Sequence, residues 1–327
     1  MVLIPKVELH LHLDCSLSYA AVSRLDPSIS RAEYDLEFVA PSLCASLADF
    51  LTRAPRGFRL MQTRDALRLA TEDVFEQLRA DGVVYAELRF APLLHLLRGL
   101  APEEVVEAVD RATEQCIAAT GIEARLILCT LRHFNAEQSL TTVQLVERFR
   151  GSRVVALDIA GDEAGYPLDA HVAAFRYAAD RGLHRTAHAG EACGAASVWE
   201  TLRVLQPSRI GHGVRSAEDG SLVEYIRQRR IHLEVCPSSN VQTRASASYA
   251  EHAVDRLYRA GVSLGISTDT RTITNVTLEQ EYARLREHFA WTDAEFLACN
   301  REALRAAFIE EDVRERLLTR LRSSEPL

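Results

Sequence analysis

Residues 6–14 read Lys-Val-Glu-Leu-His-Leu-His-Leu-Asp, so apolar and polar side chains alternate along this segment. A two-residue period predicts a β-strand with the leucines and Val7 on one face and the polar side chains on the other. The polar face holds Glu8, His10, His12 and Asp14. Two histidines on one face of a strand can both reach one metal ion. A half-exposed strand with incidental histidines would show the same pattern, so this segment alone leaves both interpretations open.

The rest of the chain repeats such strands. Short runs rich in Val, Ile and Leu alternate with helix-like stretches such as Pro102–Ala119 and Ala195–Leu205. The predicted strands are Val7–Leu13, Val83–Ala91, Ala124–Leu131, Val154–Ile159, His184–Ala189, Arg209–Gly213, His232–Cys236 and Ser263–Ser267. This alternation predicts an α/β protein with a parallel sheet, closed as a (β/α)8 TIM-type barrel. A doubly wound open sheet is the alternative, but no G-x-G-x-x-G motif follows the first strand.

Two parts of the chain lie outside this repeat. About 70 residues separate the first two strands, far more than a usual loop. Helical signals at Arg31–Phe38, Leu43–Thr52 and Arg64–Arg79 predict a helical insertion over the barrel mouth. The tail, Thr292–Leu321, is helical and charged, and we expect it to pack outside the barrel. With no repeats or linker-like stretches, the prediction is a single domain spanning residues 1–327.

Composition excludes several classes of function. The net charge is −8, and basic residues are mixed with acidic ones, so no nucleic-acid surface is expected. No apolar run is long enough to cross a membrane, and no signal peptide is apparent. The seven cysteines are scattered without a C-x-x-C pair, which is typical of reduced thiols in a cytoplasmic protein. The oligomeric state is left open.

Reactive residue types recur at predicted strand ends. His188 and Glu191 end the fifth strand, His212 ends the sixth within Ile-Gly-His-Gly, and Asp269 ends the eighth. Taken singly, each histidine is more typical of a hydrogen-bonded core residue, and Asp269 could cap a helix. The carboxyl ends of barrel strands meet at one mouth, so together these residues predict a zinc site with a neighbouring acid and a proton shuttle.

Other polar residues receive weaker expectations. His133 follows the third strand and either lines the pocket or supports it from behind. Ser238 and Ser239 follow the seventh strand, where a hydrogen bond near the site is expected. The remaining histidines are expected to be structural or exposed: His95, His171, His184, His232, His252 and His288.

Several segments, in order and at matching spacing, resemble the adenosine deaminase family of metal-dependent amidohydrolases. They are VELHLHLD at 7–14, YAELRFAP at 85–92, DIAGDE at 158–163, HRTAHAGE at 184–191, IGHG at 210–213, EVCPSSNVQT at 234–243 and STD at 267–269. The resemblance covers nearly the whole chain. It implies a zinc-dependent hydrolase that converts adenosine or 2′-deoxyadenosine to the inosine product and ammonia.

The resemblance also assigns roles to residues. It implies one Zn²⁺ per chain, held by His10, His12, His188 and Asp269. It implies that Glu191 protonates N1 of the purine and that His212 acts on the water that attacks C6. For substrate binding it implies Asp14 at the sugar, the backbone of Gly161 at the purine edge and Thr270 near N7. The partner is therefore a small-molecule purine nucleoside.

Two positions depart from the family pattern. Cys15 stands where the family commonly has glycine, and Thr270 stands where a second acidic residue is common. Neither change removes a ligand or the acid, so both bear on substrate choice. Packing is the favoured role for Cys15, with a substrate contact or an oxidisable thiol as alternatives. Deamination of another 6-aminopurine (adenine, an N6-substituted purine, a nucleotide or an aminofutalosine-type compound) is the alternative function. A metal-binding barrel without catalysis is the second alternative.

Overall fold

A computed structural model describes residues 4–322 and forms an eight-stranded parallel sheet in the order β1 to β8. The strands are β1 Lys6–His12, β2 Val83–Phe90, β3 Glu123–Leu131, β4 Val154–Ala160, β5 His184–Ala189, β6 Arg209–His212, β7 His232–Val235 and β8 Leu264–Ile266. The segment after β8 returns to β1, where the Asp269 N–H donates to the His10 carbonyl at 3.0 Å and the His12 N–H donates to the Asp269 carbonyl at 2.7 Å. The predicted TIM-type barrel is confirmed.

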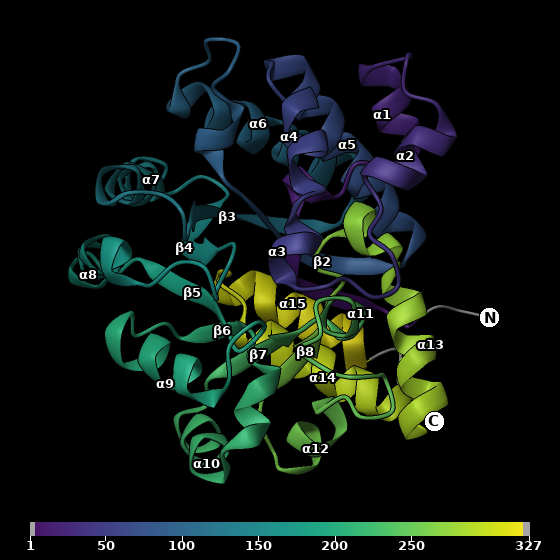
Figure 1. The fold of residues 1–327 in the computed structure, drawn as a ribbon, viewed down its shortest axis with the longest axis vertical. Helices are drawn as coiled ribbons and strands as arrows, with labels where there is room; N and C mark the ends of the chain where they lie inside the picture. Colours follow the sequence, from purple (N-terminus) through teal and green to yellow (C-terminus); the bar gives the residue numbers. More distant parts are fainter. Residues whose placement is uncertain (1–3, 323–327) are drawn as a thin grey trace.

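Helices surround the strands (Figure 1). Each covers the sheet with an apolar stripe; in α6, for example, Val105, Val106 and Val109 are buried and the opposite face is acidic. The helices between successive strands are α6 Pro102–Thr120, α7 Ala136–Arg148, α8 Val172–Asp180, α9 Ala195–Val204, α10 Gly220–Arg229, α11 Pro237–Gln242 and α12 Val254–Arg259. No helix within residues 4–322 is long and apolar enough to cross a membrane.

The long first connection is helical, as predicted. It consists of α1 Tyr19–Leu25, α2 Arg31–Glu37, α3 Leu47–Leu51, α4 Ala54–Leu60 and α5 Arg64–Ala80. Two of these helices, α1 and α4, were not predicted, and α3 begins at Leu47 rather than at Leu43, because the Ser46 side chain caps it there. In α4, Gly57 lies so close to the first strand's end that a Cβ atom would come within 2.8 Å of the Asp14 carbonyl oxygen. Glycine therefore allows α4 to pack directly beside the mouth.

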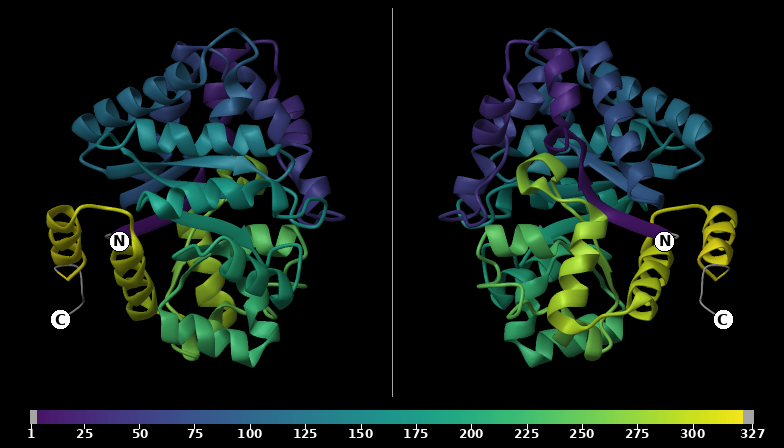
Figure 2. Two further views of the ribbon diagram at one scale, coloured as in Figure 1. Left: turned by 90° about the vertical axis from the view of Figure 1, so that its left-hand side faces the viewer. Right: turned by 90° about the vertical axis from the view of Figure 1, so that its right-hand side faces the viewer.

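The tail is also helical, but one part of it does not lie outside the barrel. It contains α14 Asp293–Ala306 and α15 Glu311–Arg322, and it follows α13 Leu278–Phe289. Between α14 and α15 the chain turns inward: the Phe308 N–H donates to Glu87 Oε1 at 2.7 Å, and the Arg209 guanidinium lies 3.7 Å from the centre of the Phe308 ring. Figure 2 shows α15, in yellow, on one side of the strands and the purple insertion helices on the opposite side. Phe308 therefore closes the end of the barrel that lies away from the insertion.

Paired charges fill the barrel interior between these two ends. Buried Arg89 bonds Asp158 at 2.8 Å and Glu234 at 2.6 Å, and Arg209 bonds both Glu234, at 2.8 Å, and Glu87. A buried charge is tolerated only when it is paired and hydrogen-bonded, and each of these side chains meets an opposite charge. Two carboxylates of this network, Asp158 and Glu234, therefore lie directly beneath the mouth.

Candidate active site

The four residues predicted to bind metal come together at the mouth. His10 and His12 lie on β1, His188 lies on β5 and Asp269 follows β8. One ligand atom from each lies within 4.8 Å of every other. These atoms come from segments as far apart as residues 10 and 269, so the barrel itself assembles the cluster.

The chemistry of this cluster fits a metal ion. His10 Nε2 is buried without a hydrogen-bond partner, and His12 Nε2 lies 3.1 Å from His188 Nε2. A buried nitrogen without a partner, such as His10 Nε2, costs free energy unless a ligand satisfies it. Burial also keeps the pKa of His12 well below its ordinary value and lowers the pKa of His188, so both rings are neutral, the form that coordinates metals. Three imidazole nitrogens with one carboxylate form a donor set that zinc accepts.

Groups behind the cluster orient the ligands. Glu234 lies 2.9 Å from Nδ1 of His10, and Asp158 lies 3.2 Å from Nδ1 of His188. A carboxylate at Nδ1 holds the proton there and directs the Nε2 lone pair at the metal position. Ser239 donates to Asp269 Oδ2 at 2.7 Å, which is the hydrogen bond near the site that the sequence predicted.

Glu191 lies beside the cluster in a form suited to donate a proton. Burial raises its pKa well above its ordinary value, which favours the protonated carboxyl. Its Oε2 lies 3.5 Å from Nε2 of His212. Glu191, His212 and Asp269 each offer one atom within 4.8 Å of the other two. The arrangement therefore places a carboxyl group with a raised pKa next to the predicted metal position.

Glu163 holds the loop that carries Glu191, a role that was not predicted; its only signal was its place at the end of the DIAGDE segment, after the fourth strand. Its carboxylate accepts the backbone N–H groups of residues 190–193 at 2.8, 3.0, 2.7 and 2.9 Å. It also accepts the Ser197 hydroxyl at 2.6 Å. Five donors on one carboxylate fix the loop and, with it, the direction of the Glu191 side chain.

The backbone at the mouth is strained at two site residues. His212 and Asp269 have φ angles of 60° and 66°, a left-handed conformation that side chains other than glycine rarely adopt. Next to His212, Gly211 packs against the ligands: a Cβ there would come within 2.9 Å of His10 Cε1. Strain of this kind is concentrated at functional sites, where the surrounding structure enforces it.

Two connected cavities adjoin the cluster. The larger, about 440 Å³, is lined mainly by apolar side chains of α3, α4 and neighbouring strand ends, together with Asp14 and His133. The smaller, about 50 Å³, reaches Glu191, His212, Asp269 and Thr270. They share His12, Cys15, Leu51, Ala160 and Gly161. No lysine or arginine is among the described residues that line either cavity.

The predicted substrate-binding residues all line these cavities. Asp14 accepts the Ala91 N–H at 3.0 Å, and burial raises the pKa of Asp14 to about 6. Gly161 has a φ of 101°, which only glycine adopts readily, so its backbone can face the cavity. Thr270 Oγ1 lies 2.8 Å from Thr274 Oγ1. Cys15 lies where the two cavities meet, with its thiol pKa raised well above the ordinary value by burial.

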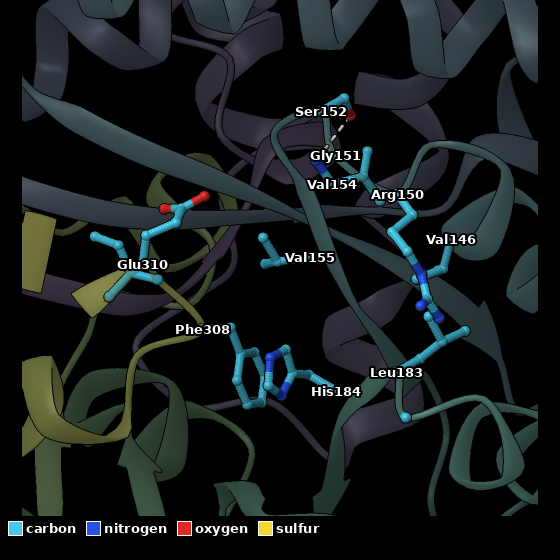
Figure 3. Close-up of a pocket in the computed structure, with 12 residues that line it drawn as sticks. Val146, Arg150, Gly151, Ser152, Val154, Val155, Leu183, His184, Phe308 and Glu310 are labelled. Carbon is cyan, nitrogen blue, oxygen red and sulfur yellow. Dashed lines mark hydrogen bonds between the residues drawn. The ribbon is translucent and has the colours of Figure 1, made fainter. Parts of the chain in front are cut away.

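A third cavity, about 370 Å³, opens near the starts of β4 and β5, at the closed end of the barrel. Figure 3 shows the His184 and Phe308 rings face to face inside it, with Arg150 and Glu310 at its sides. The two ring centroids lie 4.6 Å apart at an interplanar angle of 12°. None of the predicted catalytic, metal-binding or substrate-binding residues lines this cavity.

Known proteins resemble the chain along its whole length. A family model described as adenosine deaminase matches residues 5–324. A protein named adenosine deaminase from Mycobacterium ulcerans is 40% identical over 95% of this chain and 92% of its own. The crystal structure of an adenine deaminase from Arthrobacter aurescens superposes with a TM-score of 0.90 at 25% identity, covering 98% of both chains. The structure of an N6-mAMP deaminase from Arabidopsis gives a TM-score of 0.87 at 26% identity, again over 98% of both chains.

Proposed function

The chain belongs to the adenosine deaminase family, and from this premise we propose that it hydrolyses adenosine and 2′-deoxyadenosine to inosine and 2′-deoxyinosine with release of ammonia. It is a hydrolytic deaminase. The observation that carries the choice of reaction is the position of the buried Glu191 beside His212 and the four-residue ligand cluster, where burial raises the pKa of its carboxyl. A purine ring protonated at N1 becomes electrophilic at C6, the atom that loses its amino group.

The resident metal in this proposal is zinc, one ion per chain, held by His10, His12, His188 and Asp269. The three-nitrogen, one-oxygen donor set and the unpaired Nε2 of His10 support this choice. A zinc ion bound there would make hydroxide available near neutral pH, by lowering the pKa of water from 15.7 to about 7.

The chain's own groups supply the remaining steps. Glu191 donates its carboxyl proton to N1, and Glu163 keeps the Glu191 loop in place. His212 hydrogen-bonds the oxygen that adds to C6. Asp14 binds the sugar hydroxyls and the backbone of Gly161 meets the purine edge. The apolar helices α3 and α4 exclude bulk water from the cavity.

The cavity favours a nucleoside over a nucleotide. A phosphate group would enter a space of about 440 Å³ that offers no cationic side chain among its lining residues. Burial of an unpaired phosphate charge is costly, so AMP and N6-methyl-AMP should bind poorly. We propose a cytoplasmic location as well, because all seven cysteines carry free thiols.

A substrate panel tests this function. The zinc-loaded protein is given adenosine, 2′-deoxyadenosine, adenine, AMP and N6-methyl-AMP, and ammonia release is measured for each. We expect the two nucleosides to give the highest kcat/KM and elemental analysis to give about one zinc per chain. Turnover of adenine or of a nucleotide with adenosine inert would contradict the proposed substrate. Two tightly bound metal ions per chain would contradict the metal assignment.

A further inference from the structure

We propose that Asn240 and His252 act as positioning residues that set the tautomer of His212, holding its single ring proton on Nε2, the nitrogen that faces Glu191. This inference rests on the proposed function, in which His212 meets the attacking oxygen. The three side chains form one hydrogen-bonded line that begins at α12 and ends at the mouth. The proton positions along this line follow from one backbone donor.

The line starts at His252. The Val254 N–H donates to His252 Nδ1 at 3.1 Å, so Nδ1 is an acceptor and carries no proton. The ring is 3% exposed, and burial lowers its pKa to about 4, so it is neutral near pH 7. A neutral imidazole has one N–H group, which in His252 is therefore at Nε2.

The position of the proton on His252 fixes the orientation of the Asn240 amide. His252 Nε2 lies 3.2 Å from Asn240 Oδ1, so the His252 N–H meets the amide oxygen. The Asn240 side chain is fully buried on α11, and a flipped amide would set N–H against N–H. The amide NH2 group consequently faces His212, with Nδ2 3.0 Å from His212 Nδ1.

The orientation of the Asn240 amide determines which ring nitrogen of His212 carries the proton. An amide NH2 can only donate, so His212 Nδ1 must accept and cannot carry the proton. The ring proton is then on Nε2, which lies 3.5 Å from Glu191 Oε2. Nε2 thus presents an N–H donor to the cavity. On this assignment His212 enters the reaction by donating a hydrogen bond to the oxygen that adds to C6. This replaces the proton shuttle expected from the sequence, because Nε2 has no lone pair with which to take a proton from that oxygen.

Asn240→Asp is the decisive variant, because it keeps the shape of the side chain and replaces the amide donor with an acceptor. His212 Nδ1 must then carry a proton to meet the carboxylate, while His252 still donates to the other oxygen. In zinc-loaded protein with ¹⁵N-labelled histidine, we expect His212 to show an unprotonated Nδ1 and a protonated Nε2. In Asn240→Asp, Nδ1 should become protonated. A misplaced tautomer costs a serine-protease triad about 10⁴ in kcat, and we expect a loss of at least about 10²-fold here with little change in KM.

Variants at His252 separate positioning from folding. His252→Gln retains an N–H donor toward Asn240 Oδ1 and should keep the wild-type tautomer and most of the activity. His252→Leu removes the donor, frees the amide to rotate and should lower kcat. The matched control is His232→Leu, which removes an equally buried histidine that bonds Ser263 at 2.9 Å away from the mouth. This control should lose stability and leave the His212 tautomer and kcat unchanged.

The outcomes distinguish the two proposals. A protonated Nδ1 on His212 in the wild-type protein overturns the inference, whatever the substrate. So does an unchanged tautomer with unchanged kcat in Asn240→Asp. If the wild type shows the expected tautomer but leaves adenosine intact, the proposed function fails and the assignment of the proton stands. Should Asn240→Asp not fold, the wild-type and His252→Gln spectra decide.

Discussion

The two ends of the barrel carry cavities of similar size but opposite chemistry. At the mouth, beside a cavity of about 440 Å³, potential metal ligands converge: three imidazoles and a carboxylate within 4.8 Å. At the closed end, beside a cavity of about 370 Å³, charged groups meet opposite charges, as Arg209 meets Glu87 and Arg125 meets Glu310. Cavity volume therefore does not mark the functional end. The functional end is marked instead by ligand-type groups that converge on one point and leave a buried nitrogen of His10 unpaired, whereas at the closed end oppositely charged groups satisfy one another.

The largest expected effect is at the mouth. Glu191→Gln keeps the size of the side chain but removes the acidic proton proposed to reach N1. General acid catalysis typically contributes about 10²–10⁴-fold, so we expect kcat for adenosine to fall by that factor. Zinc content and the midpoint of urea unfolding should remain those of the parent. A kcat near the parent value would show that Glu191 is not the acid in this reaction. It would also weaken the functional contrast between the two ends of the barrel.

The opposite result is expected at the closed end. Glu87→Gln removes the buried carboxylate that faces Arg209, and breaking a buried ion pair costs about 3–5 kcal/mol. The lower value, about 3 kcal/mol, is expected because Arg209 keeps Glu234 at 2.8 Å and the glutamine oxygen can still accept the Phe308 N–H. Urea unfolding measures this loss. The kcat of the folded fraction should stay near the parent value; a loss comparable to that of Glu191→Gln would show that the two ends are not separable.

The smallest expected effect concerns substrate choice within the mouth. A neutral hydrogen bond from Thr270 to purine N7 is worth about 0.5–1.5 kcal/mol, or at most about tenfold. The parent enzyme should therefore favour adenosine over 7-deazaadenosine by no more than about tenfold in kcat/KM. Thr270→Ala should lose activity on adenosine and keep it on the 7-deaza compound. Equal losses on both would mean that the hydroxyl serves only Thr274, its neighbour at 2.8 Å.

The sequence predicted the parts of this molecule that have a strong local pattern. All eight strands were predicted, most of them with bounds within a residue or two, because buried parallel strands form short apolar runs between polar turns. Residues 10, 12, 188 and 269 could be grouped because strand ends in a barrel share one mouth. Their roles in binding metal remain predictions.

Features that depend on distant partners were not predictable. Glu163 acquires its role only by bonding a loop that begins at Gly190. His252, which was expected to be structural or exposed, reaches His212 only through Asn240. Helix α4 contains Gly57, a poor helix former, and tertiary packing overrides that weak local preference; Pro55 lies in the first turn, where proline is tolerated. Helix α12 begins only at Val254, after His252, whose ring accepts the Val254 N–H and bonds Asn240 instead of joining a helix.

The late position of Phe308 in the sequence determines when the closed end of the barrel can be covered during synthesis. Its N–H meets Glu87 across 221 positions of sequence, so the second strand leaves the ribosome long before the residue that covers it. At a synthesis rate of about 5–20 residues per second, that interval is roughly 10–45 s. During this time Glu87, and later Arg209 once it has been synthesised, lack their aromatic cover, however many strands have already paired. The last stretch of translation, between α14 and α15, therefore determines when the nascent barrel can exclude water from its base.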